Sequence, residues 1–507
     1  MEDAASAPAA AAVTRGDVAR GAGLAGLARL GALIEALAQP LYTWLFGIAA
    51  YGIYVVLWGA VSLATNIVHL SMPLALQRVV PTQEEEAAHG AVKLALLVAI
   101  VPSALIALLV TLNAARVAAL FSAAPEDAAR LPQAVALFVW ALPLWSFVEV
   151  ATSAARARRA FGPEIRLRIF WEQIARILFA LGFFALGAGS LGLMAAHLCS
   201  LAMTALLSIR LLGRYYDLRL LLVAPLPGGL VRGLLVTGLG LLPSNLARRA
   251  LIDAPPVVLN LMLPGARGAS AAALFEIARK ISTVPLIVRQ AFQYVLGPLS
   301  SAQAHVDRAQ LAPLYHFASR VSTALVLPLA GLLVFAGVDV LSLYRPEARG
   351  ALPLLFILVG ARAIEAIVGP ASAIVEMIGH RALPLLNAFI AVALWIGLAA
   401  WLTPAYGALG MAVAIGAATV ISTYAATIQL QVSDGLHPFD YKLFQALALA
   451  LAGCALMALA ERLLHGPVRF AACAALWAAT SWLTLRYGLT RADRLALGGA
   501  ARRLRLT

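Results

Sequence analysis

The sequence of 507 residues contains little charge. Asp, Glu, Lys and Arg make up 12% of it, whereas they make up about 25% of a typical soluble domain. Hydrophobic residues make up 62%. So little charge cannot cover the surface of a water-soluble body of this size, which excludes a soluble globular enzyme and a disordered chain. The net charge of +14 does not indicate a nucleic-acid binder, because the basic residues do not gather in an exposed domain.

Cysteines and catalytic motifs are also scarce. The three cysteines fall in separate apolar stretches without metal-ligand spacing, so we expect no metal site; they are Cys199, Cys454 and Cys473. The chain has no G-x-x-x-x-G-K-[ST], H-E-x-x-H or G-x-S-x-G motif, which would indicate ATP binding, zinc or a nucleophilic serine. We therefore expect neither an enzyme nor a bound cofactor.

Long apolar stretches are what the sequence has in abundance. A helix needs roughly 20 apolar residues to cross a bilayer, and about fourteen such stretches occur. They cover residues 22–45, 50–72, 93–112, 134–152, 169–187, 191–211, 233–262, 270–295, 317–340, 352–376, 384–402, 407–430, 443–462 and 469–485. The connections between them are too short for a separate soluble domain. The sequence thus predicts an all-α polytopic membrane protein whose helical bundle is the whole functional unit.

The distribution of arginine predicts the orientation of the chain. An even number of crossings places both ends on one side, and that side holds the basic segments 156–168, 210–219 and 486–505. The opposite side holds fewer basic residues, namely Arg116, Arg130, Arg267, Arg345 and Arg349, with Arg462 and Arg469 at the ends of its last spans. Because cytoplasmic loops carry the excess of Lys and Arg, we expect both termini in the cytoplasm.

Two segments of the chain resemble each other. Residues 186–196, where the fifth and sixth stretches meet, resemble residues 404–414 between the eleventh and twelfth, and glycines align in both. This predicts two six-helix bundles, 22–212 and 230–430, around a central cavity whose access alternates as the bundles rock. A cytoplasmic tail (1–21), a linker (213–229), an extra helix pair (431–485) and a basic tail (486–507) complete the division. Chance similarity is the alternative, since Gly and Ala are common in membrane helices.

Three motifs resemble a known family. They are FGIAAYGIY at 46–54, LSLYRPEARGALPLL at 341–355 and YGALGMA at 406–412. In this order and placement they are similar to the bacterial polysaccharide flippases, which export O-antigen and exopolysaccharide repeat units. These flippases belong to the multidrug/oligosaccharidyl-lipid/polysaccharide (MOP) superfamily. The resemblance covers about residues 22–430. Glu149, Glu172 and Arg176 match no family residue, so positions of the family's site cannot be carried over.

The resemblance implies a function and a location. It implies secondary transport of an undecaprenyl-pyrophosphate-linked oligosaccharide from the cytoplasmic to the periplasmic leaflet of the bacterial inner membrane. Membrane lipid surrounds such a protein, and a polysaccharide polymerase and a chain-length regulator are the partners expected in that pathway. Two alternatives from the same superfamily stay open, a lipid II exporter and a multidrug exporter. A polytopic polymerase or glycosyltransferase fits the short loops less well.

Basic residues inside the apolar stretches are candidates for binding the pyrophosphate. A charge inside a membrane is costly, so one that is present is expected to serve a function, and the planar fork of Arg matches phosphate oxygens. The candidates are Arg29, Arg248, Arg249, Arg279, Lys280 and Arg362. The plainer alternative is that Arg248 and Arg249 reach toward the membrane surface, and that Glu276 and Lys280 form a structural ion pair.

Acidic residues in the same stretches are candidates for carrying a coupling ion, either H⁺ or Na⁺. They are Glu35, Glu149, Asp253, Glu276 and Glu365. A carboxylate beside an arginine stays ionised, which favours Glu35 or Glu149 as a proton carrier over Glu276.

Adjacent prolines interrupt the seventh stretch. Pro255 and Pro256 each remove a backbone hydrogen bond and bend a helix, so we expect a hinge there. A static kink is the alternative.

Overall fold

The computed structural model describes residues 31–158, 160, 165–304, 311–378 and 382–506. The described part of the chain is helical from α2 (Gly31–Phe46) to α25 (Gly499–Arg503), and no strand occurs in it. This confirms the predicted all-α architecture.

Eleven helical segments in the described residues are long and apolar enough to cross a membrane. They are α3 (Ile48–Val68), α5 (Glu85–Leu112), α8 with α9 (Leu131–Phe138 and Ala141–Ala157), α12 (Leu191–Tyr215), α14 (Gly228–Met262), α16 (Leu311–Phe335), a 3-10 helix with α18 (Pro346–Ala351 and Leu352–Ile367), α20 (Ala382–Tyr406), α21 (Ala408–Asp434), α22 (Tyr441–Leu463) and α23 (Gly466–Tyr487). The first, fifth and eighth predicted stretches hold α2, a π-helix (Ile165–Trp171) that leads into α11 (Glu172–Ala185), and α15 (Ala266–Ala304). Each of the fourteen predicted stretches therefore contains a helix.

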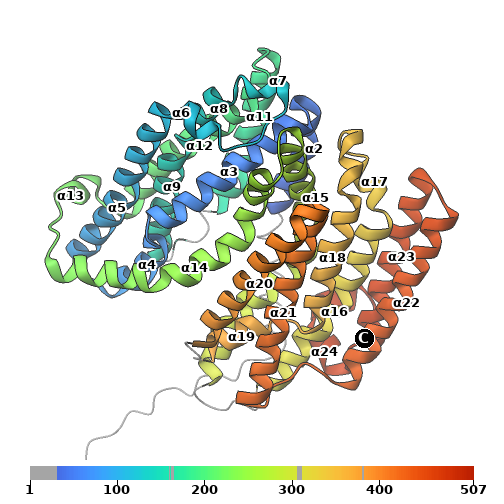
Figure 1. The fold of residues 1–507 in the computed structure, drawn as a ribbon. Helices are drawn as coiled ribbons and strands as arrows, with labels where there is room; N and C mark the ends of the chain where they lie inside the picture. Colours follow the sequence, from blue (N-terminus) through green and yellow to red (C-terminus); the bar gives the residue numbers. More distant parts are fainter. Residues whose placement is uncertain (1–30, 159, 161–164, 305–310, 379–381, 507) are drawn as a thin grey trace, which may run out of the picture.

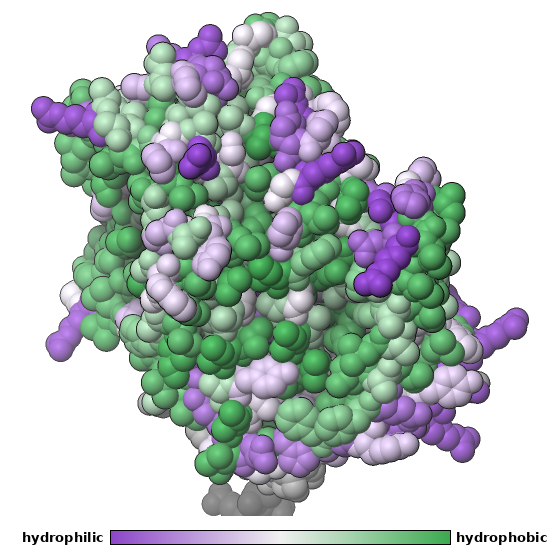
Figure 2. All heavy atoms as spheres, turned by 45° about the vertical axis from the view of Figure 1, so that its right-hand side comes forward, coloured by the Kyte–Doolittle hydropathy of each residue, from purple (hydrophilic) through white to green (hydrophobic). Residues whose placement is uncertain are grey.

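The helices form two groups (Figure 1). Helices α2 to α12 make one bundle and helices α16 to α23 make the other, while α14 begins beneath the first bundle and curves up toward α15. Helix α3 of the first bundle packs against both α14 and α15, and α15 packs in turn against α16 and α18 of the second bundle. Helices α14 and α15 therefore form the junction between the bundles. Figure 2 shows a broad hydrophobic area across the middle of one face, with hydrophilic residues mostly toward its upper and lower edges, as a membrane-embedded protein requires.

Helix α14 stays continuous through its prolines. Pro243, Pro255 and Pro256 all lie within the single helix Gly228–Met262, and the last two are buried. The helix is curved (Figure 1) but is not broken at the proline pair. Because a hinge is a property of two conformations, the hinge at Pro255 and Pro256 stays a prediction.

The molecule has two ends along the helix axes. One, which we call the Gly47 end, has a cavity of about 640 Å³ lined by the α2–α3 turn at Gly47, the α11–α12 turn at Gly189, and Arg345 before α18. The other, which we call the Asp440 end, holds the start of α22, where Asp440 pairs with Arg320 of α16. The predicted orientation places the Asp440 end in the cytoplasm.

Polar contacts join the two bundles at the Gly47 end. The indole of Trp44 donates a hydrogen bond of 2.9 Å to the Leu343 carbonyl, and Arg345 donates one of 3.1 Å to the Trp44 carbonyl. The side-chain amide of Asn260, on α14, accepts a bond from the Ser122 N–H and donates one to the Ser122 carbonyl. The bundles are thus held together at this end.

Glycine permits a close approach of helices next to these contacts. A Cβ at Gly52 of α3 would overlap the backbone carbonyl of Ala269 of α15. Any larger side chain at residue 52 must push α15 away.

We expect Gly52→Leu to shift the protein away from this conformation. Cysteines are introduced by Trp44→Cys and Leu343→Cys, and the three native cysteines are replaced by alanine. The yield of the cross-link between the two new cysteines measures how often the Gly47 end is closed. The yield should fall severalfold in Gly52→Leu. The matched control is Gly397→Leu on α20, where a Cβ meets no atom within 4 Å. Equal yields in both variants would contradict this account of the closed end.

Candidate functional site

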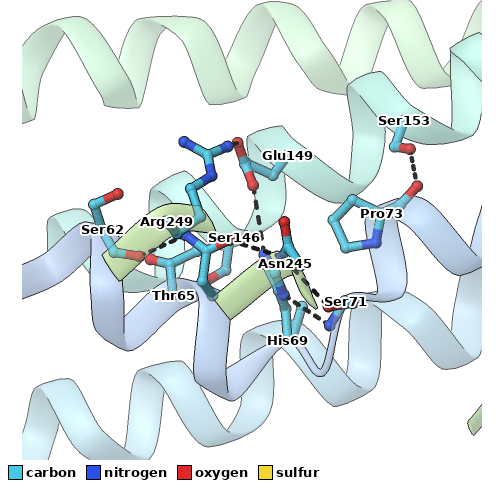
Figure 3. Close-up of polar contacts among 12 residues, drawn as sticks. Ser62, Thr65, His69, Ser71, Pro73, Ser146, Glu149, Ser153, Asn245 and Arg249 are labelled. Carbon is cyan, nitrogen blue, oxygen red and sulfur yellow. Dashed lines mark hydrogen bonds and ion pairs between the residues drawn. The ribbon is translucent and has the colours of Figure 1, made fainter. Parts of the chain in front are cut away.

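Glu149 of α9 lies at the centre of a charged cluster (Figure 3). Its carboxylate is 3.8 Å from a guanidinium nitrogen of Arg249 and 3.4 Å from the Nε2 atom of His69. A guanidinium nitrogen of Arg168 lies 3.1 Å away. The Glu149 side chain is 8% exposed. Two guanidinium groups and an imidazole from three different elements thus face one buried carboxylate.

A sharp turn after α3 positions His69. Leu70 and Ser71 both have positive φ angles, 48° and 57°, which non-glycine residues adopt at an energetic cost. This turn lets the Ser71 N–H donate a 3.2 Å hydrogen bond to Nδ1 of His69. Because Nδ1 accepts, the ring proton of a neutral His69 is on Nε2, which faces Glu149. Asn245 of α14 donates to Ser71 at 3.3 Å and so ties α14 to the same turn.

Arg168 reaches the cluster from a π-helix. Its guanidinium lies 4.4 Å from the ring centroid of Trp145, a cation–π contact. Trp145 and Glu149 are four residues apart on α9, so they share one face of that helix. The π-helix Ile165–Trp171 is a rare element that is frequent at functional sites.

Asp253 and Arg249 lie one turn apart on α14, where it packs against α3. The Asp253 carboxylate accepts a 2.7 Å hydrogen bond from Ser62 of α3. Gly59 of α3 permits this packing, because a Cβ there would lie 2.6 Å from the Asp253 carbonyl. Helix α14 also packs against α15, which carries Arg279. The predicted charges of the seventh and eighth stretches are thus brought together.

Glu276 on α15 has two cationic neighbours on its own helix. Arg279 donates two hydrogen bonds to it, of 2.7 and 2.6 Å, and Lys280 Nζ lies 4.0 Å away. The sequence pattern predicted a pair between Glu276 and Lys280, but Arg279 is the closer partner because its fork contacts both carboxylate oxygens. The side chains of Arg279 and Lys280 are 16% and 20% exposed.

The cluster carries more positive than negative charge. We call it the interface cluster, and it comprises Glu149, Asp253, Glu276, Arg168, Arg249, Arg279 and Lys280. Among the described residues it joins four cations and three carboxylates. Arg248, the neighbouring residue on α14, is exposed. The carboxylates hold the guanidinium and ammonium groups in place, so these groups are already oriented when an anion enters the cluster.

The remaining predicted site residues lie elsewhere. Arg362 and Glu365 form a pair of 2.8 Å along α18, and Glu365 is 1% exposed. Arg29 is outside the described residues. Glu35 lies in α2, and its side chain is not among those that the structure describes. Among the described residues, no group of three or more His, Cys, Asp or Glu side chains is placed to hold a metal ion.

A second buried cluster lies within the first bundle, and its partners were not predicted. Arg176 of α11 pairs with Glu172 at 2.5 Å and donates a 3.4 Å hydrogen bond to the Tyr54 hydroxyl. That hydroxyl is 3.0 Å from Nδ1 of His197, which is fully buried. Glu172 and Arg176 are spaced as i and i+4, which is a local signal for a helical ion pair, whereas no local signal indicates Tyr54 or His197.

Two partners of Glu149, Arg168 of the interface cluster and His69 beside it, also escaped the sequence analysis. Arg168 reads as one of several basic residues flanking a span, and His69 as a residue at a helix end. Both residues contact Glu149, although Arg168 is 19 positions from it in the sequence and His69 is 80 positions from it. A contact of this kind depends on the fold and leaves no mark in the local sequence.

Comparisons with known proteins identify the fold. No protein-family model matches the sequence, and no curated protein sequence matches it either. Among solved structures, the chain is similar to the lipid II flippase MurJ in an inward closed conformation. Their TM-score is 0.70 at 12% identity, over 92% of this chain and 97% of that one.

Two other transporters show the same likeness. An inward-facing multidrug resistance MATE family transporter of the MOP superfamily has a TM-score of 0.61 at 16% identity, over 83% of this chain and 95% of its own. A MOP superfamily transporter from Pyrococcus furiosus has a TM-score of 0.60 at 16% identity, over 83% and 96%. This chain is therefore a multi-pass membrane protein with the fold of the MOP-superfamily transporters.

Proposed function

We propose that this protein is a flippase that moves an undecaprenyl-pyrophosphate-linked oligosaccharide from the cytoplasmic to the periplasmic leaflet of a bacterial inner membrane. The Asp440 end and both termini would then face the cytoplasm. The observation that carries the proposal is the gathering of four cationic side chains, from α14, α15 and the π-helix, at the junction of the two bundles. Its location also supports alternating access, which moves such bundles relative to each other.

A pyrophosphate fits the chemistry of this cluster. Arg binds phosphate oxygens through two parallel hydrogen bonds, and Arg168, Arg249 and Arg279 supply three such groups. Opposite charges about 4 Å apart attract by roughly 4 kcal/mol at the effective dielectric near a protein surface, compared with about 1 kcal/mol in water. A contact between a guanidinium group and a phosphate is therefore stronger in the cluster than the same contact in water.

The carboxylates give the site a way to release its ligand. Glu149 pairs with Arg168 and Arg249, and Glu276 pairs with Arg279. A bound pyrophosphate must displace these carboxylates, which compete to return. Binding is thereby weakened to a level that permits transport.

Contacts across elements couple the site to movement of the bundles. Arg249 is on α14 at the junction, whereas Glu149 is on α9 inside the first bundle. A shift of α14 against the first bundle changes this 3.8 Å contact. Arg249 then either loses Glu149 as its counter-charge or comes closer to it. Anion binding and rocking thus act on the same ion pair.

The likeness to MurJ favours lipid II as a second candidate substrate. Lipid II carries the same polyprenyl pyrophosphate, so the interface cluster suits both substrates, and loss of peptidoglycan instead of surface polysaccharide would distinguish them. A polymerase and a chain-length regulator are partners only for the polysaccharide substrate. The likeness to multidrug transporters is weaker support for a drug exporter, because a cationic drug needs an acidic cavity.

The structure also bears on the coupling ion. Protonating Glu149 would leave Arg168 and Arg249 without their counter-charge, so the argument against Glu276 now applies to Glu149 as well. Asp253, which accepts one hydrogen bond from Ser62, and Glu35 are the proton carriers that we favour. Coupling to H⁺ or Na⁺ stays a prediction.

We expect Arg279→Gln with Lys280→Gln to lower transport at least tenfold. Each charge-assisted hydrogen bond contributes about 1.5–3 kcal/mol, and about 1.4 kcal/mol corresponds to a factor of ten. The measurement is translocation of a fluorescent undecaprenyl-pyrophosphate saccharide in proteoliposomes.

The control for this double variant is Lys93→Gln, which removes a charge from α5, where Lys93 donates to the Ala224 carbonyl. It should translocate the saccharide as the unchanged protein does. Full transport activity in the double variant, with the variant and the unchanged protein both present in the membrane, would contradict the proposed pyrophosphate site.

Glu149→Gln tests the role of the carboxylate as a competing anion. It should tighten binding of inorganic pyrophosphate by about tenfold, because Arg168 and Arg249 lose their counter-charge, and it should slow transport. Binding is measured by calorimetry and by the rise in Tm that pyrophosphate produces. The same change at Glu365, whose partner is Arg362, is the comparison. Unchanged affinity for pyrophosphate in Glu149→Gln, or tighter binding only in Glu365→Gln, would show that pyrophosphate does not bind beside α9 and α14.

A further inference from the structure

We propose that the C-terminal segment 491–505 is a docking surface for the headgroups of anionic phospholipids at the Asp440 end. The segment contains α24 (Arg491–Ala496) and α25. It exposes four arginines and two leucines, namely Arg491, Arg502, Arg503, Arg505, Leu495 and Leu504. This surface is separate from the interface cluster, and the inference does not depend on which substrate is transported.

The segment is fixed to the transmembrane bundle. Asp493 is fully buried, where it pairs with Arg320 of α16. It also closes a capping box with Thr490 at the start of α24. Trp482 of α23 donates a 2.8 Å hydrogen bond to the Leu504 carbonyl, and Arg486 donates to the Leu506 carbonyl. The exposed arginines therefore have a fixed position and do not trail in solvent.

This position is at the boundary of the membrane. Helix α23 ends at Tyr487 and α24 begins at Arg491. Beside them α22 begins at Tyr441, and Lys442 donates a 3.1 Å hydrogen bond to the Tyr487 carbonyl. The segment thus starts where two membrane-spanning helices meet the aqueous phase, at the depth of the lipid headgroups.

The two faces of the segment have different chemistry. Ala501 and Leu506 are buried in a core with Leu314, Phe317 and Leu485, whereas Leu495 and Leu504 are 58% and 48% exposed. Exposed leucines among arginines are the pattern of a segment that lies in the membrane interface. A basic residue near an anionic bilayer is attracted to it, and the attraction decreases within a Debye length.

One arginine of the segment has a different role. Arg494 donates to the carbonyls of Arg486 and Leu489, at 2.6 and 2.9 Å. These hydrogen bonds hold α24 against the end of α23, so Arg494 is left out of the proposed surface. The four exposed arginines are the ones that a lipid headgroup can reach.

Photo-cross-linking tests this surface in the full protein. The protein is placed in nanodiscs that contain photoactivatable phosphatidylglycerol, and labelled peptides are identified by mass spectrometry. We expect labelling of 491–505 in the unchanged protein. The variant Arg491→Gln, Arg502→Gln, Arg503→Gln, Arg505→Gln should show at least threefold less labelling. High salt should lower the labelling of the unchanged protein.

A matched variant removes four exposed arginines that lie outside the segment, at Arg116, Arg267, Arg349 and Arg462. It should keep the labelling of 491–505. Hydrogen–deuterium exchange of α24 verifies that each variant retains its fold. Two results would overturn the proposal. One is equal labelling in both fourfold variants, and the other is equal labelling by photoactivatable phosphatidylcholine, which would show apolar contact without charge recognition.

Discussion

The structure depends on one constraint, which is that charges within apolar spans must be balanced inside the protein. A charged side chain at the centre of a bilayer costs about 2.5–3.5 kcal/mol even by the most permissive scales. Removing one partner of a buried ion pair costs about 3–5 kcal/mol, because the other charge is left without compensation. The buried charges described above accordingly lie in clusters, and the position of each cluster indicates what it can do.

Three clusters illustrate this. Glu172, Arg176, Tyr54 and His197 lie within the first bundle, so the bundle can move as a unit without disturbing them. Arg320 holds Asp440 and Asp493 together and fixes the C-terminal segment at one end of the second bundle. The interface cluster differs from both, because its charges come from α9, α14, α15 and the π-helix and lie where the bundles meet. Movement between the bundles must therefore rearrange this cluster.

The sequence predicted the parts of this architecture that depend on local pattern. The apolar stretches were found because length and hydropathy are properties of neighbouring residues, and Glu276 was placed beside Arg279 and Lys280 because i+3 and i+4 positions share a helix face. The partners of Glu149 were not predictable. Arg249 is 100 residues away along the chain, and Arg168 is placed by a π-helix that the apolar pattern does not indicate. Helix α14 is curved and continues as one helix through the proline pair, so the hinge there stays a prediction.

The central claim is that the interface cluster binds the pyrophosphate of a lipid-linked substrate. Cryo-electron microscopy of the protein with undecaprenyl pyrophosphate tests it most directly, because the diphosphate is visible as density at a defined place. The account predicts that density between α14 and α15, in contact with Arg279 and Arg249, and with Glu149 withdrawn from Arg249. Density for the diphosphate at Arg362 on α18, or outside the bundle junction, would contradict it.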